Sequence, residues 1–304
     1  MLELLQIFVD NIAPILIIAG VGYALGRSVQ PDPRSISAVI FNVLSPSLVF
    51  YSLYDSDIGG GEIVTLFGGV IVLQTTMLGI AMAVMWMGSD IQPRQRANVL
   101  LATMSMNTGN YGLSLVAFAF GDAALSRAAV IFVANSMMNY TLGVYVASNG
   151  TTSPLQAVAA VLRTPAVYAL IAALVFSVLN FRLPLMVERP IVTLSGAAIP
   201  MMLLLLGLQL AQFKPVARSG RLLMTGVGLR MLVSPFIAAG ITLLLGMTGD
   251  ARTAFIVQGA MPTAVITLVL STQFRLDRDL MLAFIFVSTL VSPFTLSVLV
   301  AILR

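Results

Sequence analysis

The stretch Asn107-Thr108-Gly109-Asn110-Tyr111-Gly112 lies inside an apolar segment, residues 95–119, and places two glycines and two asparagines where a continuous helix would carry apolar side chains. Glycine weakens a helix, and asparagine competes for its backbone hydrogen bonds, so the stretch predicts a break. A second stretch, Gly259-Ala260-Met261-Pro262-Thr263, lies inside the apolar segment 251–273, and its proline has no amide hydrogen to donate. The sequence therefore predicts two broken helices.

The composition around these stretches indicates a membrane. Of the 304 residues, 59% are apolar and 9% are charged, whereas a soluble domain carries about 25% charged residues. A membrane-spanning helix needs about 20 mostly apolar residues. Ten segments meet this requirement and are numbered helices 1 to 10 in chain order. They are residues 5–26, 34–54, 62–87, 95–119, 124–148, 162–181, 189–212, 221–246, 251–273 and 279–303. We therefore expect an all-α polytopic membrane protein with ten transmembrane helices.

The charged loops predict an orientation. Ten helices place the loops alternately on two faces; one face holds ten of the sixteen Lys and Arg residues, the other holds five, and Arg230 lies within helix 8. Because cytoplasmic loops carry the excess of positive charge, we expect both termini to face outward. We expect the membrane to be a bacterial inner membrane. Since the first residues lack the basic region of a secretory signal, we expect 5–26 to remain as a membrane helix.

Several function classes are excluded by what the sequence lacks. It has no Cys and no His, hence no thiolate, no usual zinc ligand and no imidazole base. The carboxylates lie near the predicted span ends, so we expect no enzyme and no cofactor. The arginines are scattered and do not form the patch of a nucleic-acid binder. No phosphate-binding Gly-x-x-x-x-Gly-Lys-Ser/Thr motif is present, which disfavours ATP-driven transport.

The chain contains an internal repeat. A shift of 154 residues brings Pro46 onto Pro200 and superposes helices 5 and 10, with seven identities in sixteen positions. Each half, residues 1–152 and 153–304, holds five helices, and an odd number requires that the second half is inverted. The same shift brings the two predicted breaks together, so four half-helix ends should lie near the membrane centre. Amide ends favour anions, and carbonyl ends favour cations.

At these residues the sequence resembles the auxin efflux carrier family, which includes bacterial permeases for malonate-like or malate-like acids and the plant PIN-type carriers. The resemblance covers essentially the whole chain. It is carried by four stretches: Phe41–Phe50, Asn107–Ser114, Ala260–Ala264 and Ser288–Ser292. The sequence departs from the family pattern at Ser114, where the family often has proline, and it lacks the long loop of many plant members.

The resemblance implies an architecture. A scaffold of residues 1–54 and 162–212 would dimerise, and a transport domain of residues 62–148 and 221–304 would move against it in an elevator-like way. Helices 4 and 9 would cross at the substrate site.

Candidate site residues follow from helix 4. Asn107 and Asn110 offer amide groups suited to a carboxylate, although such amides also tie helices to one another. Thr108, Gly109 and Tyr111 would add backbone groups and an aromatic wall.

Helices 9, 2 and 7 contribute further candidates. Pro262, with Met261 and Thr263, predicts a functional break, and Gln258 either faces the substrate or packs between helices. Pro46 and Pro200 would curve helices 2 and 7 around the site, with direct contact as a further role. Asn42 shares the helical face of Pro46 and either reaches the substrate or bonds the carbonyls that the proline frees.

Arg230 lies about 13 Å inside helix 8 at 1.5 Å per residue from Arg221. An ionisable group at that depth is a candidate countercharge for an anion, and snorkelling to the interface is the alternative. The remaining polar residues of helices 5 and 10 form a path or ion site, or hold the broken helices in place. They are Asn135, Asn139, Ser288, Thr289 and Ser292.

Together these features predict a secondary transporter for a small organic anion such as a carboxylate, with an open question of which ion, if any, is coupled. The alternatives are a sodium-coupled symporter similar to bile-acid carriers and, from another class, a transporter-like receptor or a channel. The expected partners are the substrate, membrane lipid and a second copy of the chain.

Overall fold

The computed structural model describes residues 2–88, 91–150, 155, 159, 161–179, 181–213 and 220–304, and all regular secondary structure in these ranges is helical. This confirms the all-α expectation. Among the described residues, seven helical stretches are long and apolar enough to cross a membrane. Lys214 and Arg218 of the charge count, and the predicted repeat boundary at 152/153, lie outside the described residues.

The first half of the chain forms α1 (Leu2–Ile7), η1 (Phe8–Ile12), α2 (Ala13–Ser28), α3 (Pro33–Val39), η2 (Ile40–Leu44), α4 (Ser45–Tyr54), α5 (Gly60–Trp86), α6 (Pro93–Met104), η3 (Thr108–Leu113), α7 (Ser114–Met138), η4 (Asn139–Gly143) and α8 (Val144–Ala147), where η marks a π-helical segment. The second half forms α10 (Pro165–Val178), α11 (Leu185–Leu210), α12 (Gly220–Gly228), η5 (Leu229–Val233), α13 (Ser234–Leu244), α14 (Gly249–Gly259), α15 (Ile266–Gln273) and α16 (Arg278–Leu303).

The predicted spans differ from these helices in three places. The segment 251–273 is divided into α14 and α15, and 95–119 is divided between α6 and the helix that begins at η3. The segment 162–181 is represented by the shorter helix α10. The other expected spans correspond to helices with ends shifted by a few residues, while the number of ten membrane crossings and the inverted repeat stay predictions.

Prolines explain three of the π-helical segments. Pro14, Pro46 and Pro235 are each the second residue of the helix that directly follows a π segment. A proline removes the hydrogen bond to the carbonyl four residues before it, and the wider π turn accommodates this change of register. Pro46 therefore acts through the local shape of its helix.

Gly121 changes the direction of the chain within α7. Gly121 has φ of 77° inside this element, a backbone conformation that side chains other than glycine rarely adopt. Because the chain turns there, the residues before Gly121 complete the predicted span 95–119, and the residues after it form the span 124–148.

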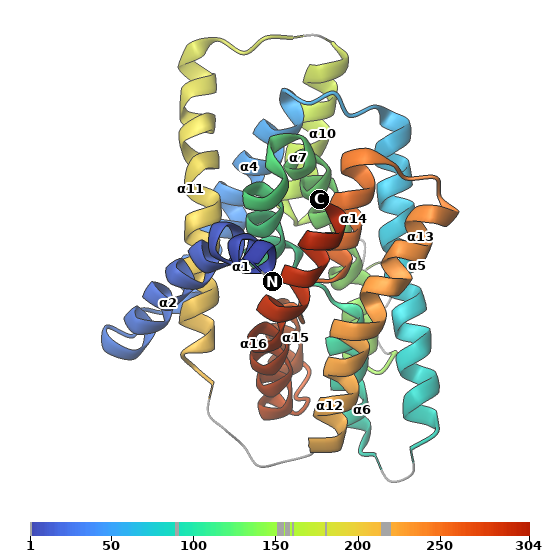
Figure 1. Ribbon diagram of the computed structural model, residues 1–304. Coiled ribbons are helices and arrows are strands. Elements are labelled where there is room, and N and C mark those ends of the chain that lie inside the picture. Colours follow the sequence, from blue (N-terminus) through green and yellow to red (C-terminus); the bar gives the residue numbers. More distant parts are fainter. Residues whose placement is uncertain are drawn as a thin grey trace.

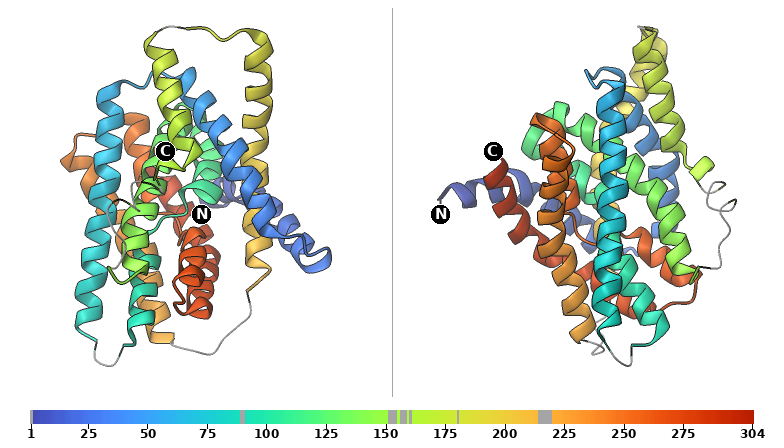
Figure 2. Two further views of the ribbon diagram at one scale, coloured as in Figure 1. Left: turned by 180° about the vertical axis from the view of Figure 1, so that it is seen from behind. Right: turned by 90° about the vertical axis from the view of Figure 1, so that its right-hand side faces the viewer.

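The helices fall into two packed groups (Figures 1 and 2). In the first group, α2 lies against α11, and α4 packs on both α10 and α11. In the second group, α5 packs on α6, α7 and α13, while α14 packs on α7 and α13. The two ends of the chain lie near each other, and Arg304 Nη2 donates to Asn11 Oδ1 at 2.9 Å.

The first group depends on small residues at the contact of α2 with α11. A Cβ placed on Gly22 would lie 2.2 Å from the carbonyl oxygen of Leu204, and one on Gly207 would lie 1.9 Å from that of Ala19. Lipid offers no hydrophobic driving force between helices, so close backbone contact of this kind stabilises their association.

The helix that leads into the site begins at a defined cap. The carboxylate of Asp32 accepts from the amides of Arg34 at 3.1 Å and Ser35 at 3.3 Å. The hydrogen bond from the Arg34 amide lowers the pKa of Asp32 below its ordinary value. This cap fixes the start of α3, which carries side chains into the cavity described below.

Gly22→Ala is expected to destabilise the protein by about 1–3 kcal/mol, because its methyl group overlaps the α11 backbone. Gly20→Ala, on the same helix, is the matched control, since a Cβ there meets nothing within 4 Å. Thermal unfolding in detergent measures both variants. Equal melting temperatures for the two would contradict the close contact.

Candidate functional site

The two helix breaks meet. After α6 ends at Met104, the amide of Asn107 donates to the carbonyl of Pro262 at 2.9 Å, and the amide of Ala264 donates to the carbonyl of Ser105 at 3.0 Å. Met106 and Thr263 thereby form an isolated antiparallel bridge. Each broken segment satisfies backbone groups of the other, which is what a broken helix needs inside a membrane.

Side chains from α5 and α7 support the first break. Asn135 Nδ2 donates to the carbonyl of Met106 at 3.0 Å and to Thr108 Oγ1 at 2.8 Å. Its Oδ1 accepts from Gln74 Nε2 at 2.6 Å. Asn135 and Gln74 are both buried. Their uncharged side chains join α5, α7 and the first break in one hydrogen-bond network.

The second break has its own supports. Thr263 Oγ1 donates to the carbonyl of Ala102 at 3.1 Å, and the amide of Thr263 donates to Ser288 Oγ at 3.1 Å. Gln258 Nε2 donates to the carbonyl of Thr108 at 3.3 Å. Thr263, Ser288 and Gln258 therefore hold the two breaks together.

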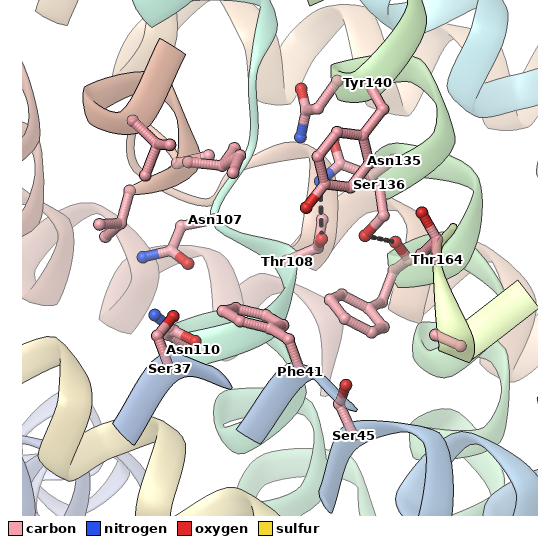
Figure 3. A pocket seen from close by; sticks show the side chains of 18 of the residues that line it. Ser37, Phe41, Ser45, Asn107, Thr108, Asn110, Asn135, Ser136, Tyr140 and Thr164 are labelled. Carbon is pink, nitrogen blue, oxygen red and sulfur yellow. Dashed lines mark hydrogen bonds between the residues drawn. The ribbon is translucent and has the colours of Figure 1, made fainter. Parts of the chain in front are cut away.

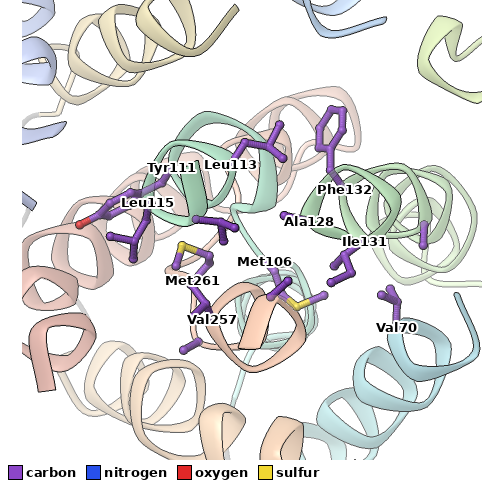
Figure 4. Packing of buried hydrophobic residues seen from close by; sticks show 14 of the residues in the cluster. Val70, Met106, Tyr111, Leu113, Leu115, Ala128, Ile131, Phe132, Val257 and Met261 are labelled. Carbon is purple, nitrogen blue, oxygen red and sulfur yellow. The ribbon is translucent and has the colours of Figure 1, made fainter. Parts of the chain in front are cut away.

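Buried apolar side chains also pack around the junction. Figure 4 shows Met106, Met261 and Val257 packed with Tyr111 and Leu115, and all five are buried. The junction therefore lies within the packed core of the protein.

A cavity of about 480 Å³ lies beside the junction, at the boundary of the two helix groups (Figure 3). From α3, η2 and α4 it is lined by Ser37, Phe41, Asn42 and Ser45. The breaks contribute Met106–Asn110 and Ala264–Ile266. The remaining walls include Phe132, Asn135, Ser136, Asn139, Tyr140, Arg163, Thr164, Pro165, Ala166, Gln209 and Val269.

Five buried polar atoms in the lining have no hydrogen-bond partner among the described residues. They are Ser45 Oγ, Asn107 Nδ2, Asn110 Oδ1, Asn139 Oδ1 and Gln209 Oε1. Buried polar groups are normally hydrogen-bonded. A group of unpaired atoms around one cavity indicates that a ligand or water supplies the missing partners.

The electrostatics of the cavity favour an anion. Arg163 is the one charged residue among the described residues that line it, and no carboxylate is present there. The segments Thr108–Asn110 and Val265–Ile266 also line it at the amide ends of η3 and α15. The first N–H groups of a helix have no partner within that helix, and the helix dipole is positive there.

The candidates from the sequence fall into two sets. Those in the cavity wall are Asn42, Asn107, Thr108, Gly109, Asn110, Asn135 and Asn139. Those outside the wall are Pro46, Pro200, Tyr111, Arg230, Gln258, Met261, Pro262, Thr263, Ser288, Thr289 and Ser292. Asn42 Nδ2 donates to the carbonyl of Ala38 at 2.8 Å, so it bonds its own helix while lining the cavity.

The structure places Arg230 in neither of the two positions considered from the sequence, which were the substrate site and the membrane interface. Its guanidinium is fully buried, so it does not snorkel to the interface, and it is outside the cavity wall. It donates to the carbonyls of Thr103 and Met261, each at 3.0 Å. The sequence placed Arg230 within a helix, as the structure does, but could not give the direction of its side chain.

Sequence reasoning missed Arg163, Gln209 and Ser45 as cavity residues. Arg163 counted as one of many loop cations, and Gln209 lies near the end of an apolar helix where polar side chains are ordinary. For Ser45 a signal existed, because it directly precedes Pro46 in the stretch that carries the resemblance of helix 2.

Comparison with known proteins gives consistent results. The family described as membrane transport protein matches residues 7–157 and 152–300. An uncharacterized transporter of Methanothermobacter thermautotrophicus is 29% identical over 93% of this chain and 94% of its own length. An uncharacterized transporter of Methanocaldococcus jannaschii is 24% identical over 92% and 94%. Auxin efflux carrier component 6 of Arabidopsis thaliana is 30% identical over 43% of this chain and 24% of its own.

Asn135→Leu is expected to lower the free energy of unfolding by about 1–3 kcal/mol or more, because it leaves buried groups of Gln74, Met106 and Thr108 unpaired. Ser136→Ala is the control, since the Ser136 hydroxyl donates to the carbonyl of Phe132 in its own helix. Thermal unfolding measures the stability of both variants. The same melting temperature in both would rule out the supporting network.

Proposed function

This chain belongs to the auxin efflux carrier family of membrane transport proteins, whose members are transporters and not enzymes, and from that premise we propose that it moves a small organic anion across the membrane as a secondary transporter. The cavity carries the proposal: unpaired polar atoms and two helix amide ends surround it, and Arg163 is the charged residue in its described lining.

A carboxylate fits the donors at the breaks. Asn107 Nδ2 lies in the wall, beside the amide end of η3, and has no hydrogen-bond partner among the residues that the structure describes. A carboxylate oxygen accepts hydrogen bonds from such groups and gains from the positive end of the helix dipole. Asn107, Thr108 and Gly109 would therefore hold the charged group.

The acceptors in the wall suit the rest of the molecule. Three buried acceptors in the wall have no partner within the described part of the chain: Asn110 Oδ1, Asn139 Oδ1 and Gln209 Oε1. A hydroxyl or N–H group on the anion would satisfy them, and Phe41, Phe132 and Tyr140 would cover its apolar part. This combination favours small acids that carry a second polar group.

The position of the cavities supports alternating access. The cavity described above has walls from the proposed scaffold and from the proposed transport domain. A second cavity of about 520 Å³ lies toward the other end of the same boundary and includes Asp55, Asp122 and Ser195. Movement of one helix group against the other would open the site to each side in turn, which is the elevator-like mechanism we propose.

The direct test is uptake of labelled malonate, malate and indole-3-acetate into proteoliposomes, with and without a sodium gradient and a membrane potential. Saturable uptake that is independent of sodium supports the proposal. Uptake that requires sodium would instead favour a sodium-coupled symporter. Absence of uptake with every acid would overturn the proposal in favour of a receptor or a channel.

Asn110→Ala is expected to abolish uptake and leave folding intact, because the side chain contacts the cavity and forms no supporting bond among the described residues. Uptake is compared with that of the parent protein at equal reconstituted amounts, and the melting temperature reports folding. Normal flux in a folded Asn110→Ala protein would show that the first break is not part of the binding site.

Arg163→Gln is expected to raise KM about fivefold with little change in kcat, since an exposed charge contributes up to about 1 kcal/mol to attraction of an anion. Arg94→Gln, another exposed arginine that is not in the described cavity lining, is the matched control. The difference should shrink at high salt. The same KM in both variants would show that Arg163 does not act on the substrate.

A further inference from the structure

Arg230 is a buried cation that has no acidic partner among the described residues. Its side chain is fully buried, and the ion pairs of the described residues are Glu62 with Arg127 and Asp55 with Arg182. An unpaired charge in a membrane interior is costly and is retained where it has a role. The acceptors around the guanidinium indicate that role.

All of those acceptors belong to the two breaks or to the next turn of its own helix. Nε donates to the carbonyl of Met261 and Nη1 to that of Thr103, each at 3.0 Å. Nη2 donates to Ser234 Oγ at 2.6 Å and also to the carbonyl of Gly259. Ser234 Oγ itself donates to the Gly259 carbonyl at 2.8 Å, which closes the group.

The carbonyls lie at the ends of two different helices. Thr103 is in the last turn of α6, and Gly259 is the last residue of α14. Met261 lies two residues after Gly259. The last carbonyls of a helix have no partner within the helix and carry its negative dipole end. In broken membrane helices, carbonyls of this kind coordinate Na⁺ in transporters that couple to it.

We propose that the Arg230 guanidinium is a resident cation at the joined breaks, which takes the place that an inorganic cation would hold at the carbonyl ends of α6 and α14. It is a positioning residue: it lies outside the cavity wall and acts through the backbone from Thr103 to Asn107. Its consequence for transport rests on the function proposed above, while its effect on the breaks does not.

The connection from Arg230 to the cavity is short. Thr103 is four residues before Asn107, and Met261 directly precedes Pro262, whose carbonyl accepts from the Asn107 amide at 2.9 Å. Loss of the guanidinium would leave carbonyls of both helices unpaired and would loosen the hydrogen bonds between the breaks. Asn107 Nδ2 and the amide end of η3 would then lose their fixed position.

The test compares two substitutions that remove the charge in different ways. Arg230→Ala leaves the carbonyls free and creates space, whereas Arg230→Met fills much of that space with an apolar chain. We expect flux of a transported acid to fall about 100-fold in both, as misplacement of binding groups by about 1 Å can cause such a loss. Added guanidinium or Na⁺ should restore flux in Arg230→Ala by at least about tenfold and leave Arg230→Met unchanged, because only the first has room for a cation.

Arg127→Ala is the matched control. Arg127 is a largely buried arginine of α7 paired with Glu62 at 2.8 Å, away from the breaks. Its flux should not respond to guanidinium. A folded Arg230→Ala protein that gains no flux from either cation, or an Arg230→Met protein with the flux of the parent, would overturn the proposal.

Hydrogen exchange gives a readout that does not depend on a substrate. The amides of Asn107 and Ala264 are bonded across the two breaks and should be protected in the parent protein. Protection at both should fall in Arg230→Met and recover in Arg230→Ala with guanidinium, while α5 keeps its protection. Unchanged protection in both variants would overturn the proposal even if the parent transports none of the acids.

Should Arg230→Ala fail to fold, Arg230→Lys and Arg230→Gln decide the question. Lysine keeps a positive charge, and glutamine keeps donors without the charge. The proposal expects protection at Asn107 and Ala264 to be greater in Arg230→Lys than in Arg230→Gln. Equal protection in the two would contradict a role as a cation.

Discussion

A backbone amide or carbonyl cannot be left unpaired in a membrane interior, and two broken helices create four ends that need partners. The carbonyl ends of α6 and α14 receive the guanidinium of Arg230. The breaks also pair with each other, from Asn107 to Pro262 and from Ala264 to Ser105. What remains are the amide ends of η3 and α15, which lie at the cavity. The polarity of the site therefore follows from how the helix ends are satisfied.

The two arginines have different positions and different consequences. Arg230 is buried among carbonyls and fixes the breaks, whereas Arg163 is exposed at the cavity wall and can attract an anion. Two neutral amides lie in the same cavity wall as Arg163: Asn135 donates to the carbonyl of Met106 in the first break, and Asn107 has an unpaired Nδ2 among the described residues. In the proposed site, Arg163 and the neutral amide of Asn107 would therefore contact the anion, while Arg230 would act on the backbone of the breaks.

The sequence predicted the elements that depend on local chemistry. Gly109 and Asn110 marked the first break and Pro262 marked the second, because glycine, asparagine and proline each act on the backbone at their own position. Directions of side chains depend on tertiary packing and could not be predicted in the same way. Arg230 was correctly placed within a helix, yet its partners come from the ends of α6 and α14, distant in sequence. Gln258 and Thr263 bond the junction instead of lining the cavity, because the chain enters the wall only after the break, at Ala264.

The central claim is that an anion binds where the amide ends of the broken helices meet the cavity, and protection of a single thiol tests it most directly. The chain has no cysteine, so Ser37→Cys, in the cavity wall, would carry the one thiol to be alkylated. The acid with the highest uptake among malonate, malate and indole-3-acetate is added during labelling, beside its neutral amide. The account predicts that the acid slows alkylation and the amide does not. Equal rates with and without the acid would contradict it.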